Sequence, residues 1–527
     1  MFKLIINNIE KEFKDPIKAI KLVNDSNILA ICLDNKVHDL NYIIKKSGKI
    51  KFIYKQDEDG QLIYRRTLDF IFIYAMHKLY NADVYFSHSF AKGQYIRVEN
   101  IDIDKIDIES VKNYMLNVIK QDLPIIRKVV TKQEAVAFFD QHNKLDCAQL
   151  LNNRNSNLCS IYQLDDIYDY FYGVMLPSCS YIDKFSIAKV HDGIWLASED
   201  IPFVDQPKLF EIFNRFEKNG LKNDLSCIND LNNNISIDQK KMISIAEKRF
   251  NDDIRLITNN IITDPNIKLI LISGPSSSGK TTFSKILEKM LSACGLNCLC
   301  LSLDDFFKER QDSPRLQDGS YDYENIDCID LSLFNKCMND LINNKGCYLP
   351  TFDFIDGKKI FSKEATYLTN DQILIIEGLH ALNPLTTQNI ADKYKYKIYI
   401  NALTHLNFDK HNYISTSDYR LIRRMTRDYK FRGQSVTDTI KQWPKVKDGE
   451  NKYIYPYQEE ADSILNTSLE YELAIFKKIL MPLLLEVDKD LDEYLLANRI
   501  KHILEYVNEA DESLVPDNSI LREFIGH

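Results

Sequence analysis

Residues 269–283 read LILISGPSSSGKTTF, an apolar run followed by a turn of glycine and serine. The run 269–272 predicts a buried strand, and the turn fits the pattern G-x-x-x-x-G-K-[ST] in the strand-to-helix context that this pattern requires. Gly274 and Gly279 allow the backbone N–H groups between them to turn inward around a phosphate, where a side chain would obstruct the approach. The sequence therefore predicts a nucleoside triphosphate site at this turn.

The residues of the turn divide the expected work of phosphate binding. Lys280 brings a flexible positive charge to the β- and γ-phosphates, and the hydroxyl of Thr281 suits a Mg²⁺ ligand. The following helix directs its positive end at the anion. The expected nucleotide-binding residues are Gly274, Ser276, Ser277, Ser278, Gly279, Lys280, Thr281 and Thr282. A turn without a ligand is the alternative, but the fixed positions and both flanks favour the nucleotide site.

Composition limits the class of protein. The chain has 527 residues, 45% of them hydrophobic and 27% charged, which is typical of a soluble globular protein of about three domains. The net charge of −9 argues against a strongly basic nucleic-acid-binding protein. We find no apolar run of membrane-spanning length and no signal-peptide pattern, so a cytoplasmic location without membrane contact is expected. The eleven cysteines are expected to be reduced.

The first 60 residues alternate short apolar runs with turns, which predicts a small β-rich module. Helices are expected over 68–79 and near 108–120, separated by a loop over 88–95. That loop holds His88, which we interpret as a local hydrogen-bonding residue because a single histidine is a weak signal.

The stretch 219–234 is rich in Asn, Lys and Asp and predicts a surface connection. After it, Ser236 and Gln239 have capping-box spacing and open an expected long amphipathic helix.

The N-terminal region resembles the ubiquitin-like and second additional domains of threonyl-tRNA synthetases. The matching landmarks are Arg65, Ala75, Leu79, Tyr80, Gly93, Tyr95, Lys132, Glu134, Ala135, Phe138, Asp169, Gly173 and Pro177. In that family two histidines, then a cysteine and a third histidine, form a hydrolytic editing site. The corresponding positions here hold Arg66, Phe70, Phe171 and Met175. Such side chains neither bind a catalytic metal nor transfer protons, so editing of mischarged tRNA is expected to be absent.

Two further predicted strands end in carboxylates. The strand 297–303 is followed by Asp304, and the strand 372–376 is followed by Glu377. Carboxyl ends of parallel strands meet at the ligand crevice of a doubly wound sheet. The alternation of strands and helices predicts an α/β domain whose mostly parallel sheet is covered on both faces.

A basic segment follows the expected sheet. Arg420, Arg423, Arg424 and Arg427 have the spacing of one helix face, and Lys430 and Arg432 come shortly afterwards. A solvated basic face is the alternative interpretation. In a chain with a phosphate-binding turn, we favour a lid that clamps phosphates.

The segment 269–462 resembles the uridine kinase and phosphoribulokinase family of P-loop kinases. Its motifs here are GPSSSGKT, LSLDDFF, YDYE, PTFDF, IIEG and RRMTRDYKFRGQ. With the synthetase-like region and the ending SILREFIG, the whole chain is similar to the long bacterial nucleoside kinases that carry such an N-terminal region.

The resemblance implies roles for individual residues. Asp304 would be the general base for the substrate hydroxyl, and Thr281, Asp304 and Glu377 would hold Mg²⁺. Lys280, Arg427 and Arg432 would act on the ATP phosphates. The implied substrate-binding residues are Asp322, which would hold the ribose hydroxyls, Phe352, Arg424 and Gln442.

The chain departs from the family pattern at four positions. Phe307 and Phe352 replace typical tyrosines, Gly357 stands in place of a base-reading histidine, and Gln434 in place of a lid arginine. Polar contacts to a base edge provide strong discrimination between bases, so the base preference stays open.

The expected architecture is modular. The predicted domains are a ubiquitin-like (TGS-like) module at 1–60, a region like the synthetase second additional domain at 61–205, a helical connection at 206–265, the P-loop kinase domain at 266–468 and a helical extension at 469–527. The leading hypothesis is ATP- and Mg²⁺-dependent phosphorylation of the 5′-hydroxyl of a ribonucleoside, uridine or cytidine. The alternatives are an RNA- or tRNA-binding regulator with an ATP-binding switch and a kinase of another small sugar. The sequence does not decide between a monomer and a homo-oligomer.

Overall fold

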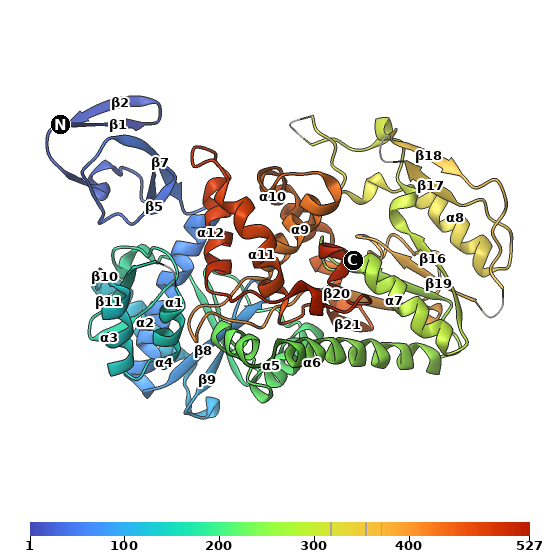
Figure 1. Cartoon of the computed structure of the whole chain (residues 1–527), viewed down its shortest axis with the longest axis horizontal. Helices are drawn as coiled ribbons and strands as arrows, with labels where there is room; N and C mark the ends of the chain where they lie inside the picture. The colour runs from blue at the N-terminus through green and yellow to red at the C-terminus, as the bar shows by residue number, and fades with distance from the viewer. Residues whose placement is uncertain (155, 317–318, 354–355, 370–371, 527) are drawn as a thin grey trace.

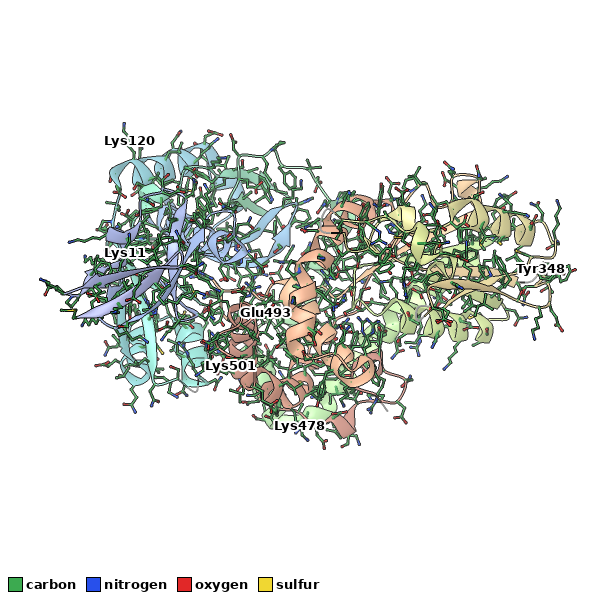
Figure 2. All side chains as sticks on the ribbon, turned by 90° about the horizontal axis from the view of Figure 1, so that it is seen from above. Lys11, Lys120, Tyr348, Lys478, Glu493 and Lys501 are labelled. Carbon is green, nitrogen blue, oxygen red and sulfur yellow. The ribbon has the colours of Figure 1, made fainter. Side chains whose placement is uncertain are left out.

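The structure is a computed structural model that describes residues 1–154, 156–316, 319–353, 356–369 and 372–526. Phe354, the last residue of the PTFDF motif, lies outside these ranges. The molecule is elongated, with the N-terminal module at one end and a parallel sheet near the other (Figure 1). Seen from above, Lys11 and Tyr348 mark these opposite ends (Figure 2). The described residues include no helix that is long and apolar enough to cross a membrane.

The parallel sheet is the part of the fold that positions the site. Its strands are β15 (Leu269–Ser273), β16 (Asn297–Ser302), β19 (Gln372–Glu377), β20 (Lys395–Asn401) and β21 (Ser463–Asn466). The spatial order is β16-β19-β15-β20-β21, and every neighbouring pair is parallel. The predicted parallel sheet is therefore confirmed.

Both faces of the sheet are covered. Ile270 and Ile272 join a core that contains residues of α7 (Lys280–Ala293), whereas Leu269 and Leu271 join a core that contains residues of α8 (Leu331–Ile342). Burial on both faces explains why β15 is continuously apolar rather than alternating. Beside this sheet, β17 (Pro350–Asp353) and β18 (Lys358–Phe361) form an antiparallel pair.

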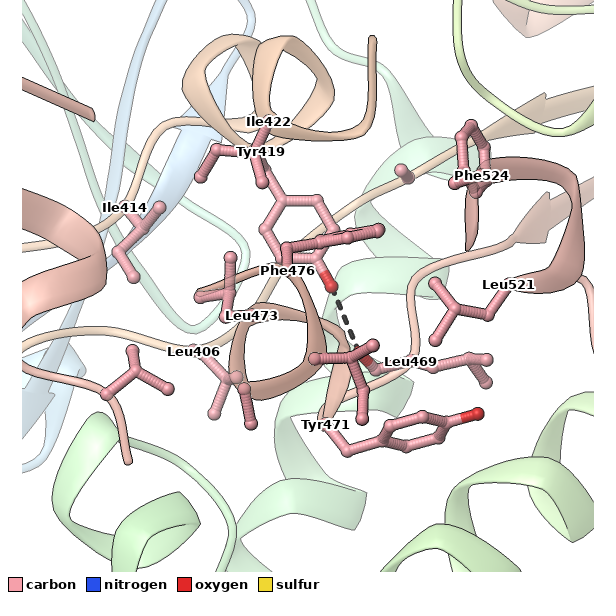
Figure 3. Close-up of a cluster of buried hydrophobic side chains, with 14 of the residues drawn as sticks. Leu406, Ile414, Tyr419, Ile422, Leu469, Tyr471, Leu473, Phe476, Leu521 and Phe524 are labelled. Atoms are coloured by element: carbon pink, nitrogen blue, oxygen red, sulfur yellow. Dashed lines mark hydrogen bonds between the residues drawn. The ribbon is translucent and has the colours of Figure 1, made fainter. Parts of the chain in front are cut away.

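The C-terminal helices pack against the same domain. They are α9 (Thr416–Arg432), α10 (Val436–Tyr453), α11 (Glu472–Leu485), α12 (Tyr494–Glu505) and the short α13 (Arg522–Ile525). Figure 3 shows the part of their common core between α9, α11 and α13, in which the hydroxyl of Tyr419 donates a 3.0 Å hydrogen bond to the carbonyl of Leu469. Phe476 of α11 and Phe524 of α13 lie in the same cluster. The apolar side chains of this cluster are thus buried within the chain.

The N-terminal module is a five-stranded sheet of order β2-β1-β7-β4-β5. Its strands are β1 (Phe2–Ile6), β2 (Ile9–Phe13), β4 (Ile28–Leu33), β5 (Lys36–His38) and β7 (Gly48–Tyr54), and the short strands β3 (Ile17–Lys18) and β6 (Ile43–Ile44) pair beside it. The predicted β-rich character of this module is confirmed.

The next region holds a four-stranded sheet, a three-stranded sheet and four helices. The sheets are β13-β14-β9-β8 and β10-β11-β12. Their strands are β8 (Asp83–Phe90), β9 (Gly93–Glu99), β10 (Ile125–Thr131), β11 (Leu158–Leu164), β12 (Ile167–Asp169), β13 (Ser186–Val190) and β14 (Gly193–Ala197). The helices are α1 (Glu58–Tyr80), α2 (Ile108–Gln121), α3 (Lys132–Gln141) and α4 (Leu145–Asn152).

The predicted loop over 88–95 is wrong. His88 lies in β8, and the chain turns at Ala91 and Lys92, whose φ angles of 48° and 64° allow a tight hairpin. The ring of His88 is buried and stacks on Phe213 with centroids 3.7 Å apart. Burial lowers the pKa of His88 to about 3, so this histidine is an uncharged core residue.

The predicted surface connection over 219–234 is also wrong. The segment belongs mostly to α5 (Pro207–Lys222) and α6 (Ile228–Thr263), and the apolar side chains of Leu225, Ile228 and Leu231 are buried, whereas Leu221 is exposed. Ser236 does not cap a helix, because its hydroxyl donates to the carbonyl of Asn232 within α6. The helix kinks at Asp238 instead, and this residue's carboxylate accepts the N–H of Lys241.

The loop between β20 and α9 connects the two halves of the molecule. The N–H of Phe86 donates to the carbonyl of Lys410 at 2.8 Å, and the side chain of Asn407 donates to the carbonyl of Phe86 at 2.8 Å. The same loop brings His411 within 2.7 Å of the carboxylate of Asp169. A loop of the domain that contains the parallel sheet is therefore embedded in the N-terminal half.

Candidate active site

The phosphate-binding turn has the geometry that its glycines predict. Gly279 has a φ of +91°, which few other residues adopt without strain. At Gly274 an added Cβ would lie 2.1 Å from the carbonyl oxygen of Ile400 on β20. Both positions therefore require glycine, one for its backbone conformation and the other for the close approach of a neighbouring strand.

Buried side chains form hydrogen bonds to the backbone of the turn. Glu450 accepts the N–H of Ser276 at 2.9 Å, and the guanidinium of Arg420 donates to the carbonyl of Ser276 at 3.0 Å. The hydroxyl of Thr467 donates to the carbonyl of Ser278 at 2.6 Å. Sequence analysis did not identify Glu450 or Thr467, because neither belongs to a recognisable motif and both lie far from the turn along the chain.

Two of the four arginines that were predicted to clamp phosphates form buried ion pairs within the protein instead. The side chains of Arg420 and Arg423 are 1% and 0% exposed and form ion pairs with Glu450 and Glu472. The expectation that all four arginines face the phosphates is wrong, because α9 packs this side of its surface against α10 and α11. Arg424 does face the site, and its guanidinium donates to the hydroxyl of Ser276 at 2.8 Å.

Lys280, Asp304 and Glu377 meet at the carboxyl ends of the strands. The hydroxyl of Thr281 donates to Glu377 at 3.3 Å, and Ser302 donates to the same oxygen at 3.3 Å. Burial and the nearby charge of Glu377 raise the pKa of Asp304 to about 6. Burial lowers the pKa of Lys280 despite the charges of Glu377 and Asp304. The charged groups therefore lie in one poorly hydrated cluster.

The oxygen atoms of this cluster fit Mg²⁺. Thr281, Asp304 and Glu377 supply one hydroxyl and two carboxylates, which are the hard ligands that this ion prefers. The raised pKa of each carboxylate reflects burial of negative charge, which a bound cation would relieve. Across the described ranges no group of three or more His, Cys, Asp or Glu could hold a metal unaided. Mg²⁺ in phosphoryl-transfer sites is typically bound by one or two carboxylates together with phosphate oxygens.

The acceptor side carries two further acidic residues. The carboxylate of Asp322 accepts from Asn325 at 3.5 Å and is partly buried. Burial and the charge of Glu450 raise the pKa of Glu324 to about 7. Local sequence could not reveal that Glu324 would titrate near neutrality, because the shift comes first from burial and then from the charge of Glu450, which is more than a hundred residues away along the chain.

Aromatic residues complete the acceptor side. The rings of Phe307 and Phe352 lie 5.7 Å apart at 73°, an edge-to-face contact. Gly357 has a φ of +69°, and its carbonyl accepts the N–H of Arg310 at 3.0 Å. A side chain at Gly357 would be strained and would contact Arg310.

The remaining predicted residues occupy the end of α9 and α10. Arg427 and Arg432 form ion pairs with the buried carboxylate of Asp428 at 3.4 and 3.3 Å. Gln442 is exposed on α10, next to the buried Trp443. The structure therefore brings the nucleotide-side residues together, whereas Gln442 stays at the surface.

A glycine-rich turn after β15, a lysine at its end and carboxylates at the ends of β16 and β19 define a P-loop kinase domain. In agreement, residues 269–473 match the model of the Phosphoribulokinase / Uridine kinase family. This match supports a kinase domain of that family in the C-terminal part of the chain.

Relatives match the same part of the chain. The uridine kinase of Lactobacillus helveticus is 28% identical over 208 residues, which are 39% of this chain and 90% of that protein. Uridine-cytidine kinase B of Dictyostelium discoideum is 27% identical over 218 residues, 41% of this chain and 82% of that protein. Among solved structures, a D-glycerate 3-kinase from Cryptococcus neoformans covers 39% of this chain and 89% of its own, with 15% identity and a TM-score of 0.28. Such a low score supports no functional conclusion.

The positions compared with a synthetase editing site lie in the N-terminal core. The rings of Phe70 and Phe171 are 5.2 Å apart, and the guanidinium of Arg66 donates to the carbonyl of Val174 at 3.2 Å. Met175 is buried in the same core. Apolar rings and an arginine thus occupy this region.

Proposed function

We propose that the protein transfers the γ-phosphoryl group of ATP to the 5′-hydroxyl of a ribonucleoside, with uridine or cytidine as the substrate. The observation that carries this proposal is the cluster of Lys280, Asp304 and Glu377 around the P-loop. The names of the relatives, uridine kinase and uridine-cytidine kinase, support the substrate class.

Asp304 would accept the proton of the attacking hydroxyl. A pKa of about 6 keeps this carboxylate mostly ionised at neutral pH while leaving it more basic than an ordinary aspartate. Lys280 and the backbone N–H groups of the turn would stabilise charge that develops on the transferred group. Mg²⁺, when held by Thr281, Asp304 and Glu377, would supply further neutralisation of phosphate charge.

Arg427 and Arg432 would approach the phosphates from α9. Both now share the carboxylate of Asp428, so their contribution requires a rearrangement of these ion pairs when ATP binds. Arginine is suited to this role because its planar guanidinium can bind two phosphate oxygens at once.

Asp322 would hold the ribose hydroxyls, and Phe352 and Arg424 would contact the bound nucleoside. The backbone at Gly357 disfavours a side chain, so a base contact from this position is missing. We therefore expect weaker discrimination between bases than a polar base contact would give.

A coupled assay of ADP release tests the proposal. The purified full-length protein would receive Mg·ATP and, in separate reactions, a ribonucleoside, a pentose phosphate or no acceptor. Turnover that depends on uridine or cytidine is the expected result. Dependence on a pentose phosphate would favour a sugar kinase, and hydrolysis without an acceptor, or silence, would favour an RNA-binding protein with an ATP-binding switch.

A further inference from the structure

The end of the chain returns to the phosphate-binding turn. The family match ends at residue 473, yet residues 519–526 lie against the turn and the neighbouring helix α9. Ile520 covers Gly279 so closely that an added Cβ there would lie 2.7 Å from the Cδ1 atom of Ile520. Figure 1 shows the C-terminus beside α7, the helix that follows the turn. We call residues 519–526 the C-terminal segment.

Glu523 of the C-terminal segment brings a negative charge into the site. Its Oε1 atom lies 3.8 Å from the guanidinium of Arg427. Its Oε2 atom would be 3.9 Å from a Cβ on Gly279 and, among the described residues, is buried without a hydrogen-bond partner. Burial lowers the pKa of Lys280, and the charge of Glu523 is one of those that oppose this shift. The carboxylate therefore lies beside the cations expected to bind phosphate.

The segment is also attached to α9. Lys430 donates to the carbonyl of Ile525 at 2.9 Å and forms an ion pair with Glu512 at 3.6 Å. The ring of Phe431 lies 3.2 Å from a Cβ built on Gly526. These contacts connect the C-terminal segment to the part of α9 that carries Arg427 and Arg432. A displacement of one would therefore affect the other.

The contact of Glu523 differs from the structural ion pairs of this domain. Arg420 donates to the two carboxylate oxygens of Glu450 at 2.5 and 2.6 Å, and both side chains are 1% exposed. Glu523 instead approaches Arg427 at 3.8 Å, beyond hydrogen-bond distance, and is 17% exposed. A loose ion pair of this kind is weak, so a ligand with stronger charge can replace it.

We propose that the C-terminal segment is autoinhibitory and that Glu523 competes with the phosphates of ATP for Lys280 and Arg427. This inference rests on the proposed ATP site. A carboxylate and a phosphate are both anionic acceptors, and two such groups in one poorly hydrated site repel each other. ATP binding therefore requires Glu523 to move away, together with the segment that closes over Gly279. Release of the segment would also free the end of α9 to reposition its arginines.

Titration calorimetry of the full-length protein with Mg·ATP tests the inference. Glu523→Gln is expected to lower the Kd for Mg·ATP about fivefold or more, because it removes a like charge from the phosphate site. Adenosine has no phosphate, so its affinity is expected to stay unchanged. Glu523→Asp keeps the charge but withdraws it by one methylene, and is expected to give an intermediate affinity. Glu509→Gln, the same substitution at an exposed glutamate outside the C-terminal segment, is the matched control and is expected to leave the Kd unchanged.

The outcomes separate the inference from the proposed function. If the parent protein binds Mg·ATP and phosphorylates a nucleoside, but Glu523→Gln leaves the Kd unchanged or raises it, the inference alone is overturned. If neither protein binds Mg·ATP, the proposed function is overturned as well. An equal change in the affinities for ATP and adenosine would also contradict competition with phosphate. Should Glu523→Gln fail to fold, an unchanged Kd in Glu523→Asp would decide against the inference.

Discussion

Two clusters of charged side chains, one at the P-loop and one in the N-terminal half, differ in how their charges are matched. In the N-terminal half, the carboxylate of Asp169 is bonded to His411 at 2.7 Å and to Lys144 at 2.9 Å. Burial alone would raise the pKa of Asp169, but the charges of His411 and Lys144 outweigh it and hold the pKa below its ordinary value. Its charge is therefore fully compensated within the protein.

At the P-loop the carboxylates are not neutralised in this way. The ammonium of Lys280 donates to the carbonyls of Gly274 and Pro275, and the pKa of Asp304 is raised to about 6 by burial and by Glu377. The comparison separates a carboxylate whose charge is matched by two neighbouring cations from carboxylates whose pKa values burial raises, and the second pattern, together with the P-loop, is typical of a binding site.

The largest expected effect concerns catalysis. Asp304→Asn should lower kcat/KM for the nucleoside about a thousandfold, because a general base contributes about 10²–10⁴ to the rate. The coupled ADP-release assay measures this change. Asp305→Asn is the matched control, since the carboxylate of Asp305 accepts the N–H of Phe352 at 3.3 Å and is not assigned to the proton transfer; a loss below about tenfold is expected. Equal rates for Asp304→Asn and the parent protein would refute the assignment.

The second expected effect concerns the buried ion pairs of α9. Arg423→Met leaves the carboxylate of Glu472 buried without its cation and should lower the free energy of unfolding by about 3–5 kcal/mol. Urea unfolding followed by the fluorescence of the two tryptophans, Trp195 and Trp443, measures this change. Arg255→Met removes a partner of Asp252 from an exposed pair and should cost less than about 1 kcal/mol. Similar losses in both variants would show that Arg423 is not the structural residue that its burial indicates.

These pairs mark the limit of what the sequence predicts. The P-loop strand and helix were predictable because a local pattern specifies them. Periodicity showed that Arg420 and Arg423 share a face of α9, but the burial of that face depends on Glu450 and Glu472, which come from later helices. The contact between Gly279 and Ile520 likewise joins distant parts of the chain and leaves no local signal.

The N-terminal errors have the same origin. The stretch 219–234 is polar, yet it forms helices because a few apolar side chains reach a core assembled from other regions. His88 is polar by type but is buried against an aromatic ring that follows more than a hundred residues later, Phe213. Local composition could not reveal either partner.

The third expected effect is a pH dependence of stability. Asp169 raises the pKa of His411 against the opposing effect of burial. A raised pKa in the folded state contributes stability that is present below about pH 6.5 and is lost as the pH rises through the folded pKa. Thermal unfolding of the parent protein should therefore shift to lower temperature as the pH rises above about 6.5.

His411→Gln should reduce this pH dependence, because glutamine does not titrate. His77→Gln is the matched control, since His77 is exposed on α1, and it should behave like the parent protein. An unchanged pH dependence in His411→Gln would mean that another group causes the pH dependence of thermal unfolding. It would also mean that a protonated His411 does not neutralise the charge of Asp169.

The smallest expected effect concerns the hydrolysis of mischarged tRNA, for which no catalysed rate is expected. The N-terminal region should not hydrolyse a mischarged threonine tRNA faster than buffer does. The side chain of Arg66 packs closely on Gly173, since an added Cβ there would lie 2.7 Å from the guanidinium carbon. The arginine and the rings of Phe70 and Phe171 leave neither a metal ligand nor a proton-transfer group at these positions. Release of the labelled amino acid with time measures the rate. If the region hydrolyses the tRNA ester faster than buffer and Arg66→Ala abolishes this activity, the N-terminal region also carries catalytic charge. The difference drawn between it and the P-loop would then be wrong.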